Sequence, residues 1–240
     1  MSKDPIFKFK KFEIDQSHCL MKVGTDGILL GAWCDVQGAK KVLDIGTGTG
    51  LVALMITQRT KNTMIMAVEV DQESSHQAKM NFDTSMWHDR LDLYKGTIQD
   101  FAHQGTSQFD HIVCNPPFFS GGTLSTNQDK NNVRHTIKLS HQDLLKSVRT
   151  LISTNGKFSL ILPLIEGLRF IELAETYGLN CERKTEVKSR IKGNVERLLL
   201  QFSKVQSKGL KEDELIIYKS DSKDYTNDFI ELTKDFYLKM

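Results

Sequence analysis

The residues with the clearest chemical potential are Asn115, Pro116, Pro117 and Phe118, which directly follow an apolar stretch at 109–114. An exocyclic amine on an aromatic ring is a poor nucleophile because its lone pair is delocalised into the ring. Two acceptors aimed at its N–H groups, the Asn115 side-chain oxygen and the Pro116 carbonyl, would localise that lone pair. The Phe118 ring can stack on a flat target, a contact worth about 1–3 kcal/mol. These four residues therefore predict a catalytic turn that aligns a planar nitrogen, with alignment supplying most of the rate.

A glycine-rich turn lies upstream, with Gly46, Gly48 and Gly50 between an apolar stretch and a helical pattern. In such a place the backbone can pass close to a ligand, and the helix N-terminus favours the ligand's anionic part. Dinucleotide-binding folds have a third glycine for helix–strand packing where this chain has Leu51. The spacing G-x-G-x-G instead resembles that of S-adenosylmethionine-dependent methyltransferases, and it counts against NAD.

An acid ends the next apolar stretch. The carboxylate of this acid, Glu69, can accept hydrogen bonds from both hydroxyls of a ribose. After the third strand Thr97 stands where an acid would read an adenine amine, and Asp100 fits a structural acid at a helix start. The cofactor-binding residues predicted around these motifs are Asp44, Gly46, Gly48, Gly50, Glu69, Val70, Thr97, Ile98 and Asn115.

The scaffold that would position these residues begins at Lys40, from which strand and helix patterns alternate. This alternation predicts an α/β fold with a parallel sheet and helices on both faces. Predicted strands are 42–45, 64–69, 91–94, 109–114, 158–163, 181–188, 198–203 and a short 214–218. Predicted helices are 51–59, 73–83, 140–151 with Ser140 as N-cap, 166–177 and 225–237. The polar stretch 119–139 is expected to form a long loop, either a functional lid or disordered.

Composition bounds the class of protein. The 240 residues suffice for one domain, and 39% hydrophobic with 26% charged residues is typical of a globular protein. The net charge of +2 means that a nucleic-acid partner must be met by a local patch. The four scattered cysteines predict reduced thiols, and the dispersed histidines predict no metal site. No apolar run is long enough for a membrane helix, so we expect a cytoplasmic protein without a membrane partner.

The flanks of these motifs resemble a known family, the bacterial tRNA1(Val) adenine N6-methyltransferases. The likeness covers essentially the whole chain, in order and spacing. The segments that carry it are Phe9–Phe12, Met21–Gly27, Gly31–Trp33, Arg134–His135, Leu139–Leu145 and Leu232–Tyr237, together with the two core motifs. The family often has tyrosine where Phe118 stands and an acid where Thr97 stands.

This resemblance implies a Rossmann-like class I methyltransferase sheet of seven strands, mostly parallel, with the last strand antiparallel. It also implies S-adenosylmethionine as the methyl donor, with Lys22, Thr25 and Asp26 near its methionine end. The expected organisation is an N-terminal extension at 1–35 that covers substrate and cofactor, followed by a methyltransferase domain at 36–240. The sequence leaves the oligomeric state open.

Two basic groups are candidates for binding tRNA. The first joins Lys3, Lys8, Lys10 and Lys11 to the interleaved Phe7, Phe9 and Phe12, a mixture found on nucleic-acid-binding surfaces. The second lies near the end of the chain and consists of Arg183, Lys184, Lys188, Arg190, Lys192 and Arg197. Arg134 and His135, on the loop after the catalytic turn, are expected to meet phosphates beside a base that leaves its stack.

The catalytic turn alone leaves two targets open, the N6 amine of adenine and the side-chain amide of a protein glutamine. Glutamine methylation would call for a substrate-recognition domain ahead of the core, whereas only about 35 residues precede it here. A third reading is a non-catalytic RNA-binding subunit that keeps the fold. The intact glycine turn, Glu69 and Asn115 favour an active enzyme over such a subunit.

Overall fold

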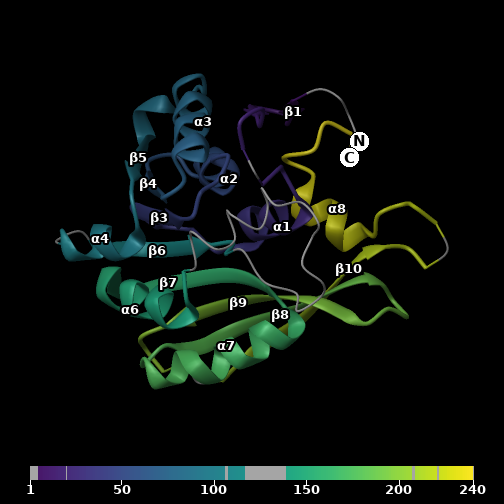
Figure 1. Cartoon of the computed structure of the whole chain (residues 1–240). Helices are drawn as coiled ribbons and strands as arrows, with labels where there is room; N and C mark the ends of the chain where they lie inside the picture. The colour runs from purple at the N-terminus through teal and green to yellow at the C-terminus, as the bar shows by residue number, and fades with distance from the viewer. Residues whose placement is uncertain are drawn as a thin grey trace, which may run out of the picture.

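A computed structural model of the chain describes residues 5–19, 21–105, 108–116, 139–206, 209–220 and 222–239. Its main sheet runs in the order β10-β8-β9-β7-β6-β3-β4-β5 (Figure 1). The strands are β3 (Lys41–Ile45), β4 (Met64–Glu69), β5 (Leu91–Lys95), β6 (Phe109–Cys114), β7 (Ile152–Pro163), β8 (Asn180–Arg190), β9 (Val195–Ser203) and β10 (Lys211–Tyr218).

All neighbouring pairs in this sheet are parallel except those of β9, which runs antiparallel to β7 and β8. The class predicted from the sequence is therefore confirmed, including the antiparallel seventh strand. The expected count of seven is wrong by one, because β10 pairs in parallel with the outer edge of β8 and makes the described sheet eight-stranded.

Helices cover both faces of the sheet (Figure 1). One face packs against α1 (Thr25–Trp33), α2 (Leu51–Arg59), α3 (Gln72–Asp83) and α8 (Asn227–Thr233). The other face packs against α4 (Ile98–His103), α6 (His141–Leu151) and α7 (Leu164–Thr176). Successive strand residues supply the two cores alternately, as Val42 and Leu43 of β3 do, because side chains along a strand point to opposite faces.

Local signals set several of these boundaries. The hydroxyl of Ser140 accepts from the Asp143 backbone N–H at 3.0 Å and starts α6, as predicted. α8 is shorter than the predicted helix 225–237. It begins after Thr226, whose hydroxyl accepts from the Phe229 N–H, and Tyr225 before it forms a β-bridge with Tyr218.

The basic, aromatic start of the chain folds into a two-stranded antiparallel hairpin, β1 (Ile6–Lys8) and β2 (Glu13–Asp15). Phe9 and Phe12 are 4% and 7% exposed and belong to the core that α8 closes. The expectation that these rings interleave with lysines on an RNA-binding surface is therefore wrong for both. Their rings stack on each other at 4.6 Å between centroids.

The two ends of the described chain lie side by side. Phe9 and Tyr237 form a β-bridge, and the Lys10 N–H donates to the Phe236 carbonyl at 2.8 Å. The Lys10 ammonium also donates to the Lys234 carbonyl at the end of α8, at 2.6 Å. The division into an extension 1–35 and a domain 36–240 stays a prediction.

Candidate active site

The predicted site residues collect at the carboxyl edge, the side of the sheet where β3, β4, β5 and β6 end. Ligands of open α/β sheets bind at this edge, where the strand order reverses. The reversal falls between β3 and β6, which are adjacent in the sheet although β4 and β5 separate them in the chain.

The glycine turn after β3 has an open side. Gly46 and Gly48 adopt φ values of 69° and 56°, and a Cβ at either position would meet no heavy atom of the described residues within 4 Å. The positive φ values therefore require glycine at both positions, and the space beside them is free for a ligand. Gly50 differs, because a Cβ there would lie 2.5 Å from the Phe82 ring. α3 packs this closely against the start of α2 only because position 50 is glycine.

A buried carboxylate supports this turn from below. Asp44 is 2% exposed, and its Oδ2 accepts from the Thr47 hydroxyl at 2.6 Å and the Ala53 N–H at 3.2 Å. Burial raises the pKa of Asp44 to about 7, against these two hydrogen bonds, which lower it. One bond holds the turn and the other holds α2, so the Asp44 side chain fixes the turn between β3 and α2. Its predicted role toward the cofactor stays a prediction.

Glu69 lies across from the turn at the end of β4. Its Oε2 accepts from the Gly48 N–H at 2.9 Å, and its Oε1 accepts from the N–H groups of Val70 and Asp71 at 2.9 and 3.0 Å. Burial raises the pKa of Glu69, and the three N–H groups oppose that rise. A carboxylate has about four acceptor positions, so Oε2 keeps room for a ribose hydroxyl.

After β5 the chain turns into α4 through a helix cap. The Thr97 hydroxyl accepts from the Asp100 N–H at 3.0 Å and donates to the Asp100 carboxylate at 2.7 Å. This geometry agrees with Asp100 as a structural acid at a helix start. Ile98 is 4% exposed and packs in the core beside this corner. The adenine contact of Thr97 and Ile98 stays a prediction.

Asn115 follows β6 at the centre of the carboxyl edge. Its Oδ1 is buried, and among the described residues it has no hydrogen-bond partner. Its amide nitrogen would lie 3.7 Å from a Cβ at Gly27, which places Asn115 against the first turn of α1. Pro116 is buried next to it, whereas Pro117 and Phe118 lie outside the described residues. An unpaired buried acceptor costs about 1–3 kcal/mol, so its retention calls for a partner that binds there.

The start of α1 contributes an acid to the same edge. Asp26, in the first turn, accepts from the Nε of Arg197 on β9 at 2.9 Å. Thr25 before it is exposed, and the N-cap position, Gly24, offers no side-chain cap. The sequence placed Arg197 in a basic group near the end of the chain. Its pairing across the fold had no local signal.

The remaining predicted residue of this segment, Lys22, is exposed and its ammonium donates to the Gln16 carbonyl. The Gln16 side chain accepts in turn from the Val23 N–H at 2.8 Å. These bonds tie the segment before α1 to the N-terminal hairpin. Contact of Lys22 with a cofactor stays a prediction.

The first basic group is partly engaged within the chain. Lys8 pairs with Glu13 at 3.2 Å, and Lys10 binds the end of α8 as described above. Lys11 is exposed, and the structure shows no ion pair for it among the described residues. Arg134 and His135 lie outside the described residues. Among the described lysines of this group, Lys11 is thus the one that remains available to an RNA phosphate, whereas Lys3 lies outside the described residues.

The second basic group is largely neutralised by acids of β10. The ion pairs join Lys184 to Glu212 at 2.6 Å, Arg183 to Asp213 at 3.5 Å, and Lys188 to Glu214. Arg190 differs from these residues. It binds three backbone carbonyls of the segment after β10, so its guanidinium also serves the fold.

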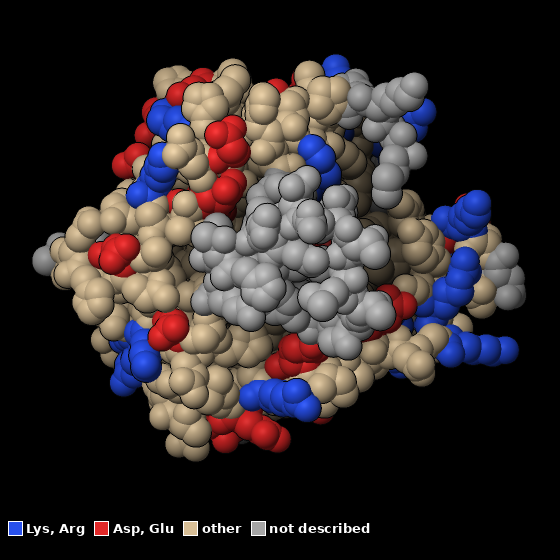
Figure 2. Space-filling model, in the orientation of Figure 1, with Lys and Arg blue, Asp and Glu red and all other residues tan. Residues whose placement is uncertain are grey.

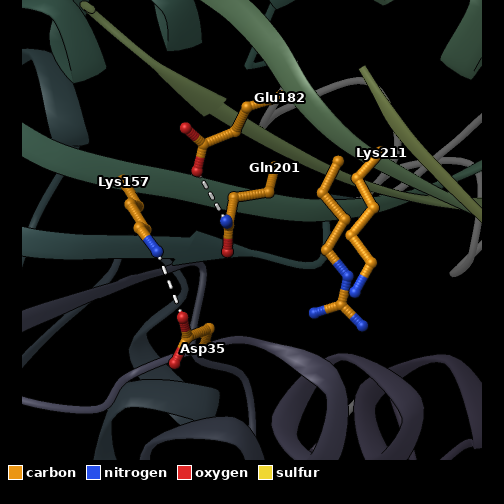
Figure 3. A pocket seen from close by; sticks show the side chains of 6 residues that line it. Asp35, Lys157, Glu182, Gln201 and Lys211 are labelled. Carbon is orange, nitrogen blue, oxygen red and sulfur yellow. Dashed lines mark hydrogen bonds and ion pairs between the residues drawn. The ribbon is translucent and has the colours of Figure 1, made fainter. Parts of the chain in front are cut away.

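A polar pocket of about 390 Å³ lies near the amino-terminal ends of β8 and β10 (Figure 3). The Lys157 ammonium pairs with Asp35 at 3.1 Å, and Gln201 donates to Glu182 at 2.7 Å. Asp35 follows the C-terminal end of α1, whereas Asn115 contacts its first turn, so this pocket is remote from the glycine turn and Asn115. These four side chains are already paired, and we assign no ligand to the pocket.

Other features of the described residues concern metals and membranes. No group of three or more His, Cys, Asp and Glu residues placed to hold a metal ion occurs among them. None of the described helices is long and apolar enough to cross a membrane. The four cysteines are free thiols, and burial raises the pKa of Cys19 and Cys34 to about 11.

The sequence of the chain is similar to known methyltransferases. Residues 21–161 match the family model described as Methyltransferase small domain. A tRNA1(Val) (adenine(37)-N6)-methyltransferase of Haemophilus influenzae is 46% identical over 97% of this chain and 98% of its own length. The chain belongs to this methyltransferase family.

Further relatives agree with this assignment. An enzyme with the same name from Trichodesmium erythraeum is 45% identical over 97% of this chain and 98% of its own. Among solved structures, a predicted O-methyltransferase from Agrobacterium tumefaciens has a TM-score of 0.71 at 17% identity, covering 88% of this chain and 96% of its own. That likeness shows the fold, and membership in the tRNA methyltransferase family rests on the close relatives.

Proposed function

We propose that this protein transfers a methyl group from S-adenosylmethionine to the N6 amine of adenine 37 in tRNA1(Val). The family's close relatives carry this activity in their names over nearly the full length of this chain. The observation in the site that carries the proposal is the buried, unpaired Oδ1 of Asn115 at the carboxyl edge. A primary aromatic amine supplies the donor that this oxygen lacks.

S-adenosylmethionine is the methyl donor, and it supplies an electrophilic methyl on a sulfonium. We propose that the cofactor lies against the backbone on the open side of Gly46 and Gly48, and that Glu69 binds its ribose. The open space beside the two glycines and the spare acceptor position on Glu69 Oε2 both fit S-adenosylmethionine. Asp26 and Thr25, at the start of α1, are proposed for its methionine end.

Asn115 and the Pro116 carbonyl then act on the nucleophile. By accepting one N–H each, they draw the amine nitrogen toward tetrahedral geometry and direct its lone pair at the methyl group. Bound S-adenosylmethionine would supply the methyl group to this nitrogen and would leave as the neutral thioether, and the methylated amine would lose one proton to solvent. Catalysis consists mainly of alignment, which can supply several powers of ten in rate. Pro117 and Phe118 are proposed to hold the flat base.

The test uses transcripts and a strain that lacks this gene. Purified protein with labelled S-adenosylmethionine should methylate total tRNA from that strain, and nucleoside mapping should place N6-methyladenosine at position 37 of tRNA1(Val). A tRNA1(Val) transcript with guanosine at position 37 is the matched control and should accept no label. Label on a glutamine of co-purifying protein, with none on tRNA, would instead support the alternative target. We propose the cytoplasm as the compartment where the enzyme meets its substrate.

A further inference from the structure

Two segments project from the carboxyl edge at the far end of the sheet. β8 is parallel to β7, since both run antiparallel to β9, and it ends level with β10, where Arg190 pairs with Tyr218. The turn 191–194 after β8 and the segment 219–224 after β10 therefore leave the sheet in the direction in which β6 reaches Asn115. Figure 1 shows these ends extending beyond the rest of the sheet.

Arg190 fastens the two segments together. One guanidinium nitrogen lies 2.8, 3.1 and 2.8 Å from the carbonyls of Lys219, Ser220 and Ser222. The guanidinium also lies 5.7 Å from the centre of the Tyr218 ring. A shallow depression of about 380 Å³ results between the segments, with Ile191 on its wall.

The lysines of these two segments differ from those within the strands. Lys192, Lys219 and Lys223 are exposed, and the structure shows no side-chain hydrogen bond or ion pair for them among the described residues. In contrast, the lysines of β8 pair with the acids of β10. Asp224 is the acid of the described segment, and its neighbour Asp221 lies outside the described residues. Figure 2 shows Lys and Arg side chains gathered on the side where Figure 1 places these ends.

We propose that this basic tip, Lys192, Lys219 and Lys223, binds the phosphate backbone of the tRNA beside the target nucleotide. β8 and β10 lie three and four strand steps from β6 in the sheet, about 14 and about 19 Å at roughly 4.8 Å per step. At about 3.4 Å per nucleotide along a duplex strand, these spans correspond to roughly four to six nucleotides. The tip thus reaches phosphates on the stem flanking a loop whose adenine lies at Asn115. This inference rests on the proposed function and names where that substrate is held.

The experiment replaces all three lysines of the tip with glutamine, as Lys192→Gln, Lys219→Gln and Lys223→Gln in one protein. The matched control carries Lys40→Gln, Lys41→Gln and Lys61→Gln, which remove the same charge from exposed positions at the amino-terminal edge of the same sheet. Affinity for unmodified tRNA1(Val) is measured by fluorescence anisotropy at several salt concentrations. Calorimetry of S-adenosylmethionine binding and thermal unfolding accompany both variants.

The tip variant should bind tRNA about tenfold or more weakly, and its salt slope should fall by roughly 2 to 3, since each lost phosphate contact removes about 0.7 to 0.9. Cofactor affinity and Tm should match those of the wild type, and the control should bind tRNA as the wild type does. An unchanged salt slope in the tip variant, or an equal loss in the control, overturns the inference. Wild-type protein that methylates no tRNA would instead overturn the proposed function.

Discussion

Replacing Asn115 with alanine should remove activity without removing stability. In the free enzyme its buried Oδ1 has no partner among the described residues, a state that costs about 1–3 kcal/mol. Alanine abolishes that cost while losing some packing, so the free energy of unfolding should stay level or rise. The acceptor is needed in the transition state, where one lost contact of this kind costs roughly 10²–10³ in kcat, or about 2.7–4 kcal/mol.

A second asparagine provides the matched control. Asn81 is 4% exposed and fully engaged: its Oδ1 accepts from the Asp15 N–H at 3.0 Å, and its Nδ2 donates to the carbonyls of Asp15 and Thr49 at 2.9 Å each. Asn81→Ala breaks three hydrogen bonds and should cost about 2–4 kcal/mol of stability. For a chain of this size that is a fall in Tm of roughly 5–15 °C.

The assay pairs thermal unfolding of both variants with single-turnover methylation of tRNA1(Val). If Asn115→Ala lowered Tm as much as Asn81→Ala, the Asn115 amide would be a structural group and the reasoning above would be refuted. Retention of more than about a tenth of the wild-type rate would equally remove Asn115 from the transition state, since 1.4 kcal/mol already corresponds to tenfold.

Three further changes probe the site and the core. Glu69→Ala should weaken S-adenosylmethionine binding about tenfold to hundredfold through the lost charged acceptor, and an unchanged dissociation constant by calorimetry would exclude Glu69 from the cofactor site. Arg197→Met should raise KM for S-adenosylmethionine up to roughly fivefold, the strength of a partly exposed ion pair, because Asp26 loses the partner that fixes it; equal KM values would contradict this role. Burial lowers the pKa of His111 from 6.5 to about 4, so the folded state binds fewer protons than the unfolded state between these values, and stability should fall by about 3 kcal/mol as pH drops from 6.5 to 4. Burial raises the pKa of Asp44, so protonation of Asp44 stabilises the fold as pH falls and opposes the effect of His111. The effect of His111 is therefore measured as the difference in urea midpoint between the wild type and His111→Gln. This difference should shrink on acidification.

Local patterns predicted the parts of the fold that depend on neighbouring residues. Helix 51–59 has the bounds expected from its apolar periodicity, and Ser140 caps α6 as its spacing from Asp143 predicted. Three strands were also predicted at their observed positions: the strand before the glycine turn, the strand that ends at Glu69 and the strand before Asn115. Because these strands are parallel and adjacent, their ends necessarily converge, which is why the site's location followed from the sequence.

Contacts between distant residues were beyond the reach of such patterns. Alternating Phe and Lys near the N-terminus fits either an exposed RNA-binding strand or a hairpin with one buried face. Which of the two forms depends on packing with α8, which lies at the other end of the chain. The sequence also does not show which group a basic side chain will bind. Arg190 and Arg197 looked equivalent in sequence, yet one binds backbone carbonyls and the other Asp26.

The pairing of the first and last described segments affects how the chain folds during synthesis. Lys10 and its partner Lys234 are separated by 224 positions. At roughly 5–20 residues per second, a ribosome takes about 11–45 s to make the second after the first. For that time Phe9 lacks the Tyr237 ring that packs against it. The nascent N-terminal segment thus exposes an aromatic ring until the segment that pairs with it has been made, so this part of the core forms late.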